Sequence, residues 1–138
     1  MGIAASLSAC QHSSNDAAVI EVAKAGYDAF AVGDMEAWAA TQADDVRWRM
    51  PKGFPYGGEY VGPQAVMEGV FSPIGKLWPD FKVEALRFHA AGNVVFVETR
   101  MTAGGKISSA LHKGVIVDGK FVEFQAFDDT GFMMKHAR

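Results

Sequence analysis

The chain has 138 residues, of which 49% are hydrophobic and 21% are charged. This length and composition are typical of one globular domain with a buried core, and they exclude a disordered chain. The formal net charge of −3 provides no basic surface, so we expect no nucleic-acid partner. No apolar run approaches the roughly eighteen residues that a membrane span requires, so we expect no membrane span.

The N-terminal segment differs from the rest of the chain. Residues 1–16 are expected to form an N-terminal arm or the remnant of a leader, and residues 17–138 a single domain. The one cysteine, Cys10, excludes an internal disulfide. Leu7-Ser-Ala-Cys10 resembles the lipobox of bacterial lipoproteins, although no Lys or Arg precedes it. We therefore expect a cytoplasmic protein, with the bacterial cell envelope as the alternative if the lipobox is genuine.

The first half of the chain has the pattern of helices. Three helices are expected, over residues 16–33, 34–45 and 63–70. Asp16 and Asp34 are suited to cap the first two, and Gly33 is suited to end the first. Pro63 falls where the first turn of a helix tolerates proline. Residues 51–62 hold two prolines and four glycines, which predicts a loop.

Strands dominate the second half. A short strand is expected at residues 46–50, and four more at residues 81–89, 93–102, 106–117 and 121–128. Gly104-Gly105 and Asp118-Gly119 are strong signals for two-residue hairpin turns, because such turns require positive φ. Helices followed by an antiparallel meander predict an α+β fold.

Two segments carry a resemblance to a known family. They are Tyr27-Asp-Ala-Phe-Ala-Val-Gly-Asp-Met-Glu-Ala-Trp38 and Val117-Asp-Gly-Lys-Phe-Val-Glu-Phe-Gln-Ala-Phe-Asp-Asp-Thr130. Together with the loop at residues 55–62 they resemble the SnoaL-like branch of the nuclear-transport-factor-2-like superfamily. The resemblance covers residues 18–134. It implies a cone in which three helices pack inside a strongly curved, mostly antiparallel sheet around an apolar pocket. That shell serves isomerases, cyclases, hydrolases and binding modules.

The catalytic groups of well-understood relatives are missing from the matching positions. The general base, the oxyanion-hole Tyr and the protonated Asp of ketosteroid isomerases fall on or near Met50, Gly26 and Lys113. The essential Asp of SnoaL-type cyclases and limonene epoxide hydrolases falls on Ala126. The resemblance therefore leaves it open whether the protein is an enzyme.

Strand parity gives a second set of candidates. Pairing Val117 with Lys120 and alternating side chains from there brings four charged residues to the pocket face. These candidate catalytic residues are Glu98, Arg100, Lys113 and Asp128. The alternative is that they form a neutralised network of ion pairs at the rim of the cone.

Apolar and aromatic residues supply the expected ligand-binding wall. They are Trp48, Met50, Phe54, Tyr56, Trp78, Phe96, Leu111, Phe124 and Ala126. By the same parity His112, Gln125 and Phe127 belong to the outer face of the sheet, where the relatives dimerise. The four histidines have no metal-ligand spacing, and no phosphate-binding loop is present, so we expect no metal and no cofactor.

Two hypotheses for function follow. The first is a pocket for a small apolar ligand, polyketide- or terpenoid-like, on which the protein acts as an acid–base isomerase, cyclase or hydrolase. The alternative is a non-catalytic ligand-binding or dimerisation domain of the same fold. In both cases we expect a homodimer formed through the outer face of the sheet.

Overall fold

The computed structural model describes residues 3–138, with side chains from residue 15 onward. The proposed lipobox, Leu7–Cys10, therefore lies outside the described side chains. The helices are α1 (Ile3–Ala31), α2 (Met35–Ala40), α3 (Pro63–Val66), the π-helix η1 (Met67–Phe71), α4 (Ser72–Leu77) and α5 (Thr130–Met134). The strands are β1 (Gln42–Met50), β2 (Gly58–Val61), β3 (Lys82–Ala91), β4 (Val94–Ala103), β5 (Lys106–Val117) and β6 (Lys120–Asp128).

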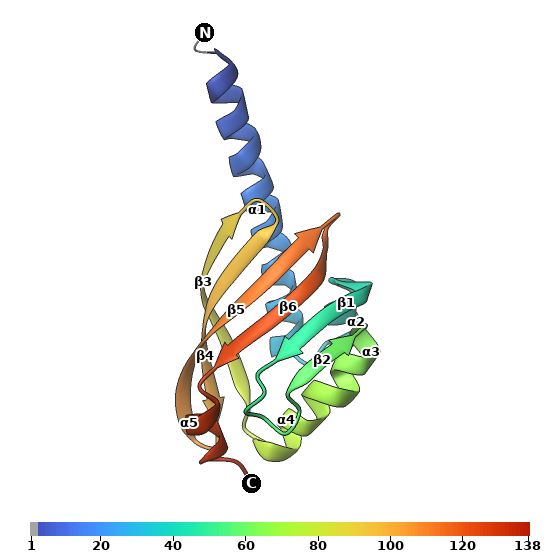
Figure 1. The fold of residues 1–138 in the computed structure, drawn as a ribbon, viewed down its shortest axis with the longest axis vertical. Coiled ribbons are helices and arrows are strands. Elements are labelled where there is room, and N and C mark those ends of the chain that lie inside the picture. The colour runs from blue at the N-terminus through green and yellow to red at the C-terminus, as the bar shows by residue number, and fades with distance from the viewer. Residues whose placement is uncertain (1–2) are drawn as a thin grey trace.

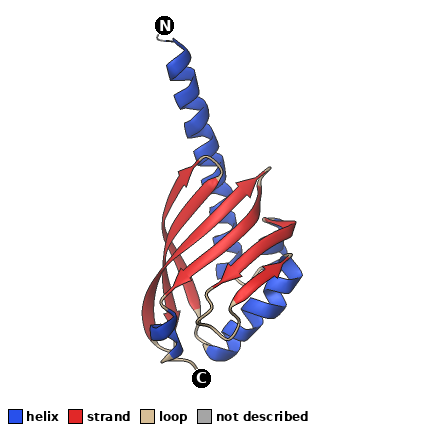
Figure 2. Cartoon of the chain, viewed as in Figure 1, coloured by secondary structure: helices blue, strands red, loops and turns tan. Residues whose placement is uncertain are grey.

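The strands form one six-stranded sheet in the order β2-β1-β6-β5-β4-β3. Strands β1 and β6 are parallel, and the other neighbours are antiparallel. The sheet curves around the helices, and the N-terminal part of α1 extends beyond the end of the sheet (Figures 1 and 2). The α+β class and the curved, mostly antiparallel sheet are thus confirmed.

Local sequence signals explain where several elements begin and end. Asp34 caps α2 as expected, because its Oδ1 accepts a hydrogen bond from the backbone N–H of Ala37 at 3.0 Å. Gly33 takes a φ of 73°, which L side chains rarely adopt, and so ends α1. The expectation that Asp16 begins α1 is wrong, because the helix starts at Ile3. Asp16 instead accepts a hydrogen bond from Gly92 N–H, at 3.0 Å, in the β3–β4 turn.

Three differences from the expected elements depend on distant partners. Strand β1 starts at Gln42, so that Asp44 and Asp45 lie in a strand and do not close a helix. Its first pair joins Gln42 to Phe121 of β6. Strand β2 lies inside the predicted loop and is only four residues long, and α5 follows the last predicted strand. Such short or distantly paired elements carry little local signal.

The register between β5 and β6 corrects the predicted faces. Val117 pairs with Lys120 as expected, but Val115 pairs with Glu123, so that Val122 is an extra residue in β6. This β-bulge shifts every later pair by one residue. A shift of one residue exchanges the two faces of a strand. His112 therefore lies opposite Ala126, at the position that strict alternation assigns to Leu111.

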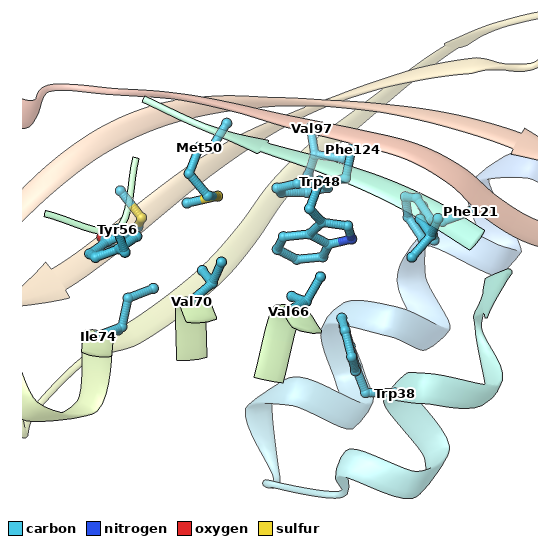
Figure 3. Packing of buried hydrophobic residues seen from close by; sticks show 14 of the residues in the cluster. Trp38, Trp48, Met50, Tyr56, Val66, Val70, Ile74, Val97, Phe121 and Phe124 are labelled. Atoms are coloured by element: carbon cyan, nitrogen blue, oxygen red, sulfur yellow. The ribbon is translucent and has the colours of Figure 1, made fainter. Parts of the chain in front are cut away.

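The core lies between the concave face of the sheet and the helices (Figure 3). Val66, Val70 and Ile74 recur every fourth residue along α3, η1 and α4, and all three are buried. The wider π-helical turn of Met67–Phe71 is suited to this spacing, because it has more residues per turn than an α-helix. Each such buried aliphatic side chain contributes about 1.5–3 kcal/mol.

Candidate functional site

A cavity opens between the helices and the concave face of the sheet. Its empty space is about 680 Å³, which includes the solvent at its mouth. Most of its lining is apolar or aromatic. The polar side chains that line it are those of Tyr27, Gln42, Tyr56, His112 and Asp128.

Aromatic rings form one wall of the cavity. Trp48 of β1 and Phe124 of β6 are neighbours across the parallel strands, and their rings stack with centroids 3.9 Å apart (Figure 3). Trp38 of α2 meets Trp48 edge-on, at 5.6 Å between centroids. The indole N–H of Trp48 donates to Gln42 Oε1 at 3.0 Å, which satisfies the one polar atom of this ring. The wall therefore presents a flat, apolar surface to the cavity.

Asp128 supplies a carboxyl group to the lining of this cavity. It is the last residue of β6, and its side chain is 4% exposed. Its Oδ1 is buried and has no hydrogen-bond partner among the described residues. Burial raises the pKa of this carboxyl to about 7, because the charged form loses the solvation of water. The group is therefore divided between acid and carboxylate near neutral pH.

His112 of β5 lies beside this carboxyl. Its Nε2 is 3.9 Å from Asp128 Oδ1, which is too long for a hydrogen bond. Its Nδ1 is 2.6 Å from the hydroxyl oxygen of Tyr27, and the two rings lie nearly parallel. Burial lowers the pKa of His112 to about 4, so that the imidazole is neutral at pH 7.

Two tyrosines complete the polar side of the cavity. Burial, and secondly the charge of Asp128, raise the pKa of Tyr27 above its ordinary range. Burial also raises the pKa of Tyr56, with smaller contributions from Asp128 and Tyr60. Both hydroxyl groups therefore remain protonated. The site combines one titratable carboxyl with neutral hydrogen-bond donors in apolar surroundings, an arrangement suited to proton transfer.

Six of the predicted site residues line the cavity. They are Trp48, Met50, Tyr56, Phe124, Ala126 and Asp128. Phe54 and Trp78 are buried next to it without lining it. Phe54 stacks on Tyr56 with centroids 4.8 Å apart, and the indole N–H of Trp78 donates to the backbone oxygen of Met133. The side chains of Phe54 and Trp78 therefore pack behind the residues that line the cavity.

The other five predicted residues lie outside the cavity. Strict alternation was wrong for Glu98, Arg100 and Lys113 and for the apolar Phe96 and Leu111, because the bulge at Val122 turns these residues to the outer face. Phe96, Glu98, Arg100 and Leu111 are exposed there.

The charged side chains on the outer face of the sheet form ion pairs with one another. Arg100 forms an ion pair with Glu84. Glu98 accepts a hydrogen bond from His89 at 2.7 Å and lies 3.8 Å from Arg87. Such exposed pairs are screened by solvent, contribute little to stability and do not face the cavity.

Three polar residues of the site were not predicted. His112 was assigned to the outer face and Gln42 to a helix, and Tyr27 was named only within the segment that carries the family resemblance. One signal in the sequence indicates the bulge. Phe121 and Phe124 are large and apolar but three residues apart, which alternation in a regular strand does not allow on one face.

No group of three or more His, Cys, Asp or Glu side chains within the described part of the chain is placed to hold a metal ion. None of the described helices is long and apolar enough to cross a membrane.

Solved structures with this fold come from several sources. An NTF2-like protein of Burkholderia thailandensis E264 is 25% identical, with 85% of this chain and 94% of that chain covered and a TM-score of 0.77. Bal32a, from a soil-derived mobile gene cassette, is 21% identical, with 90% and 99% covered and a TM-score of 0.79. TerC, co-crystallised with polyporic acid, is 22% identical, with 86% and 97% covered and a TM-score of 0.77.

No curated protein matches the sequence significantly. The SnoaL-like domain family matches residues 23–129, which include the aromatic wall, His112 and Asp128. The chain is therefore a member of the SnoaL-like family within the NTF2-like superfamily.

Proposed function

We propose that this protein is an acid–base enzyme that moves a proton on a small, largely apolar carbonyl compound, with Asp128 as the group that carries the proton. The observation behind the proposal is a buried carboxyl oxygen, Asp128 Oδ1, that has no hydrogen-bond partner among the described residues and lies in a mostly apolar cavity. An uncompensated buried carboxyl is costly to a fold, and such groups are concentrated at functional sites.

The chemistry follows from the protonation states. Asp128 as carboxylate takes a proton from the carbon beside a carbonyl group, and the carbonyl oxygen gains the negative charge. The neutral imidazole of His112 and the hydroxyl of Tyr56 are donors that can stabilise this oxygen. Asp128, now a carboxylic acid, returns the proton to another carbon in an isomerisation. In a cyclisation, the new carbanion first attacks a second carbonyl carbon of the same molecule, and Asp128 then protonates the resulting alkoxide.

The walls of the cavity favour an uncharged substrate that contains rings. Among the described side chains that line the cavity there is no Lys or Arg to pair with an anion. The stacked pair of Trp48 and Phe124 offers a flat apolar surface instead. Polyketide-like and terpenoid-like compounds have this combination of rings and carbonyl groups.

The second candidate is a non-catalytic dimerisation or ligand-binding domain. It is supported by Ala126, which stands where related enzymes have an essential Asp, and by apolar side chains on the outer face of the sheet. Phe96, Leu111 and Phe127 are 38%, 38% and 49% exposed there. We propose that this face joins two copies of the chain, since apolar groups of this size on a broad sheet favour association. A dimer is compatible with either candidate.

The two candidates differ in whether the protein catalyses proton exchange. The probe is β-tetralone, a bicyclic ketone, dissolved in D₂O at about pH 8, where most of Asp128 is ionised. Mass spectrometry follows the replacement of hydrogen by deuterium beside the carbonyl. We expect the wild type to accelerate exchange and Asp128→Asn to lose at least about 100-fold of that acceleration.

Asp45→Asn is the matched control, because Asp45 is an exposed carboxylate on β1 and should keep the wild-type rate. Binding of β-tetralone, measured by quenching of tryptophan fluorescence, accompanies the exchange assay. Binding without accelerated exchange would favour the non-catalytic candidate. Equal exchange by the wild type and Asp128→Asn would contradict the role of Asp128.

A further inference from the structure

The contact between Tyr27 and His112 is a specific one. The Tyr27 hydroxyl oxygen lies 2.6 Å from His112 Nδ1, and the two ring planes are inclined by only 13°. An edge contact with Phe124 holds the imidazole from another side, with centroids 5.0 Å apart. The ring of His112 is thus fixed in orientation, with Nδ1 towards Tyr27 and Nε2 towards Asp128.

The hydrogen-bond donors and acceptors around this imidazole favour one of its two neutral tautomers. If Nδ1 carried the proton, it would donate to the Tyr27 oxygen. The phenolic proton would then have no acceptor, because Tyr27 makes no other side-chain hydrogen bond within residues 15–138. The lone pair of Nε2 would also face the Asp128 carboxylate at 3.9 Å. If Nε2 carries the proton, the phenol donates to Nδ1 and the N–H faces the carboxyl, so that both conflicts disappear.

We propose that Tyr27 is a positioning residue that fixes His112 in the tautomer with its proton on Nε2, so that this N–H faces Asp128 Oδ1 in the cavity. The phenol can act in this way because it stays protonated throughout the physiological range. The hydrogen bond at one ring nitrogen decides which nitrogen carries the proton, and a phenol that donates to Nδ1 leaves the proton on Nε2.

The tautomer separates the roles of the two residues. His112 becomes a hydrogen-bond donor to a substrate oxygen and has no free lone pair with which to act as a base. Asp128 remains the group that takes the proton. This consequence for catalysis rests on the proposed function, whereas the tautomer itself is a property of the protein without substrate.

Nitrogen NMR of the ¹⁵N-labelled protein at about pH 8 reads the tautomer directly, because a protonated ring nitrogen and a lone-pair nitrogen have well-separated shifts. The signals of His112 are assigned by their absence from His112→Gln. We expect a lone-pair shift at Nδ1 and a protonated shift at Nε2 in the wild type. In Tyr27→Phe the ratio of tautomers should fall about fivefold, the factor that corresponds to a net hydrogen bond of about 1 kcal/mol.

Tyr60→Phe is the matched control, because it removes a phenol that donates to the backbone oxygen of Tyr56 and leaves His112 untouched. A protonated Nδ1 in the wild type would overturn the proposal. So would unchanged shifts of His112 in Tyr27→Phe.

The exchange of β-tetralone provides a second readout. Tyr27→Phe should lower kcat more than it raises KM, and it should retain the dependence of the rate on Asp128 ionisation near pH 7. If the wild type catalyses no exchange, the proposed function fails while the NMR result still decides the tautomer. If Tyr27→Phe exchanges at the wild-type rate although its tautomer has changed, the catalytic consequence is refuted.

Discussion

Replacing Asp128 by Asn should stabilise the protein at high pH and leave its stability nearly unchanged in acid. The folded protein raises the pKa of this carboxyl from 3.8 to about 7. Between these values the folded chain holds a proton that the unfolded chain has released. The stability contributed by this group therefore falls as pH rises through the window, and the full cost is present above about pH 7.

The size of the effect follows from the shift in pKa. A rise from 3.8 to about 7 corresponds to about 4 kcal/mol of stability. His112 acts in the opposite direction, because its pKa is lowered from 6.5 to about 4 and protonation destabilises the fold as pH falls through that range. Both proteins contain His112, so its contribution largely cancels in the difference between Asp128→Asn and the wild type.

Urea unfolding followed by tryptophan fluorescence tests this prediction, since Trp38, Trp48 and Trp78 are all buried. The free energy of unfolding of each protein is measured at several values between about pH 4 and about pH 8. We expect the advantage of the Asn variant to grow by about 4 kcal/mol across this range. A difference that stays constant with pH, or that grows towards acid, would refute the idea that burial leaves this carboxyl without compensation.

We expect the wild type to be a dimer and Leu111→Lys to be a monomer of 14.8 kDa in light scattering, because the lysine places a charge within the apolar outer face. A monomeric wild type would contradict the proposed interface. Gly114→Ala should cost about 1–3 kcal/mol in urea unfolding, since its Cβ would lie 2.6 Å from a neighbouring aromatic ring. Gly75→Ala, which meets nothing within 4 Å, is the control and should not be destabilised. Ala126→Asp should add a second carboxyl to the cavity and, through its own burial and its repulsion with Asp128, steepen the loss of stability with rising pH. An unchanged slope would show that the new carboxyl is solvated and does not lie in the cavity.

Local sequence signals were sufficient for most of the fold. The sequence signals for the helix cap at Asp34 and for the turns at Gly104-Gly105 and Asp118-Gly119 lie in neighbouring residues, and the structure confirms all three. The order of helices and strands, together with the family resemblance, gave the α+β cone. Strand β2 could not be found in this way, because its pairing with β1 depends on residues about ten positions away.

The candidate site was predicted only in part. Residues of β6 beyond the bulge keep the expected alternation, so that Phe124, Ala126 and Asp128 were placed correctly in the cavity. The bulge at Val122 shifts β5 by one residue, and this shift brings His112 inward. The prediction placed a cluster of four charged residues in the cavity. Because β6 contains one extra residue, the cavity instead contains the pair of His112 and Asp128. A prediction from strict alternation assumes that neither strand contains an extra residue, so it cannot include this bulge.

The most direct test of the proposed function is the dependence of β-tetralone exchange on pH, measured for the wild type and Asp128→Asn between about pH 5 and about pH 9. If Asp128 is the base of an apolar cavity, the wild-type rate should rise with pH and level off above an apparent pKa of about 7. The Asn variant should show no such rise. A profile that is already level above about pH 5, or one that is the same in both proteins, would contradict the assignment of Asp128 as the proton-carrying group.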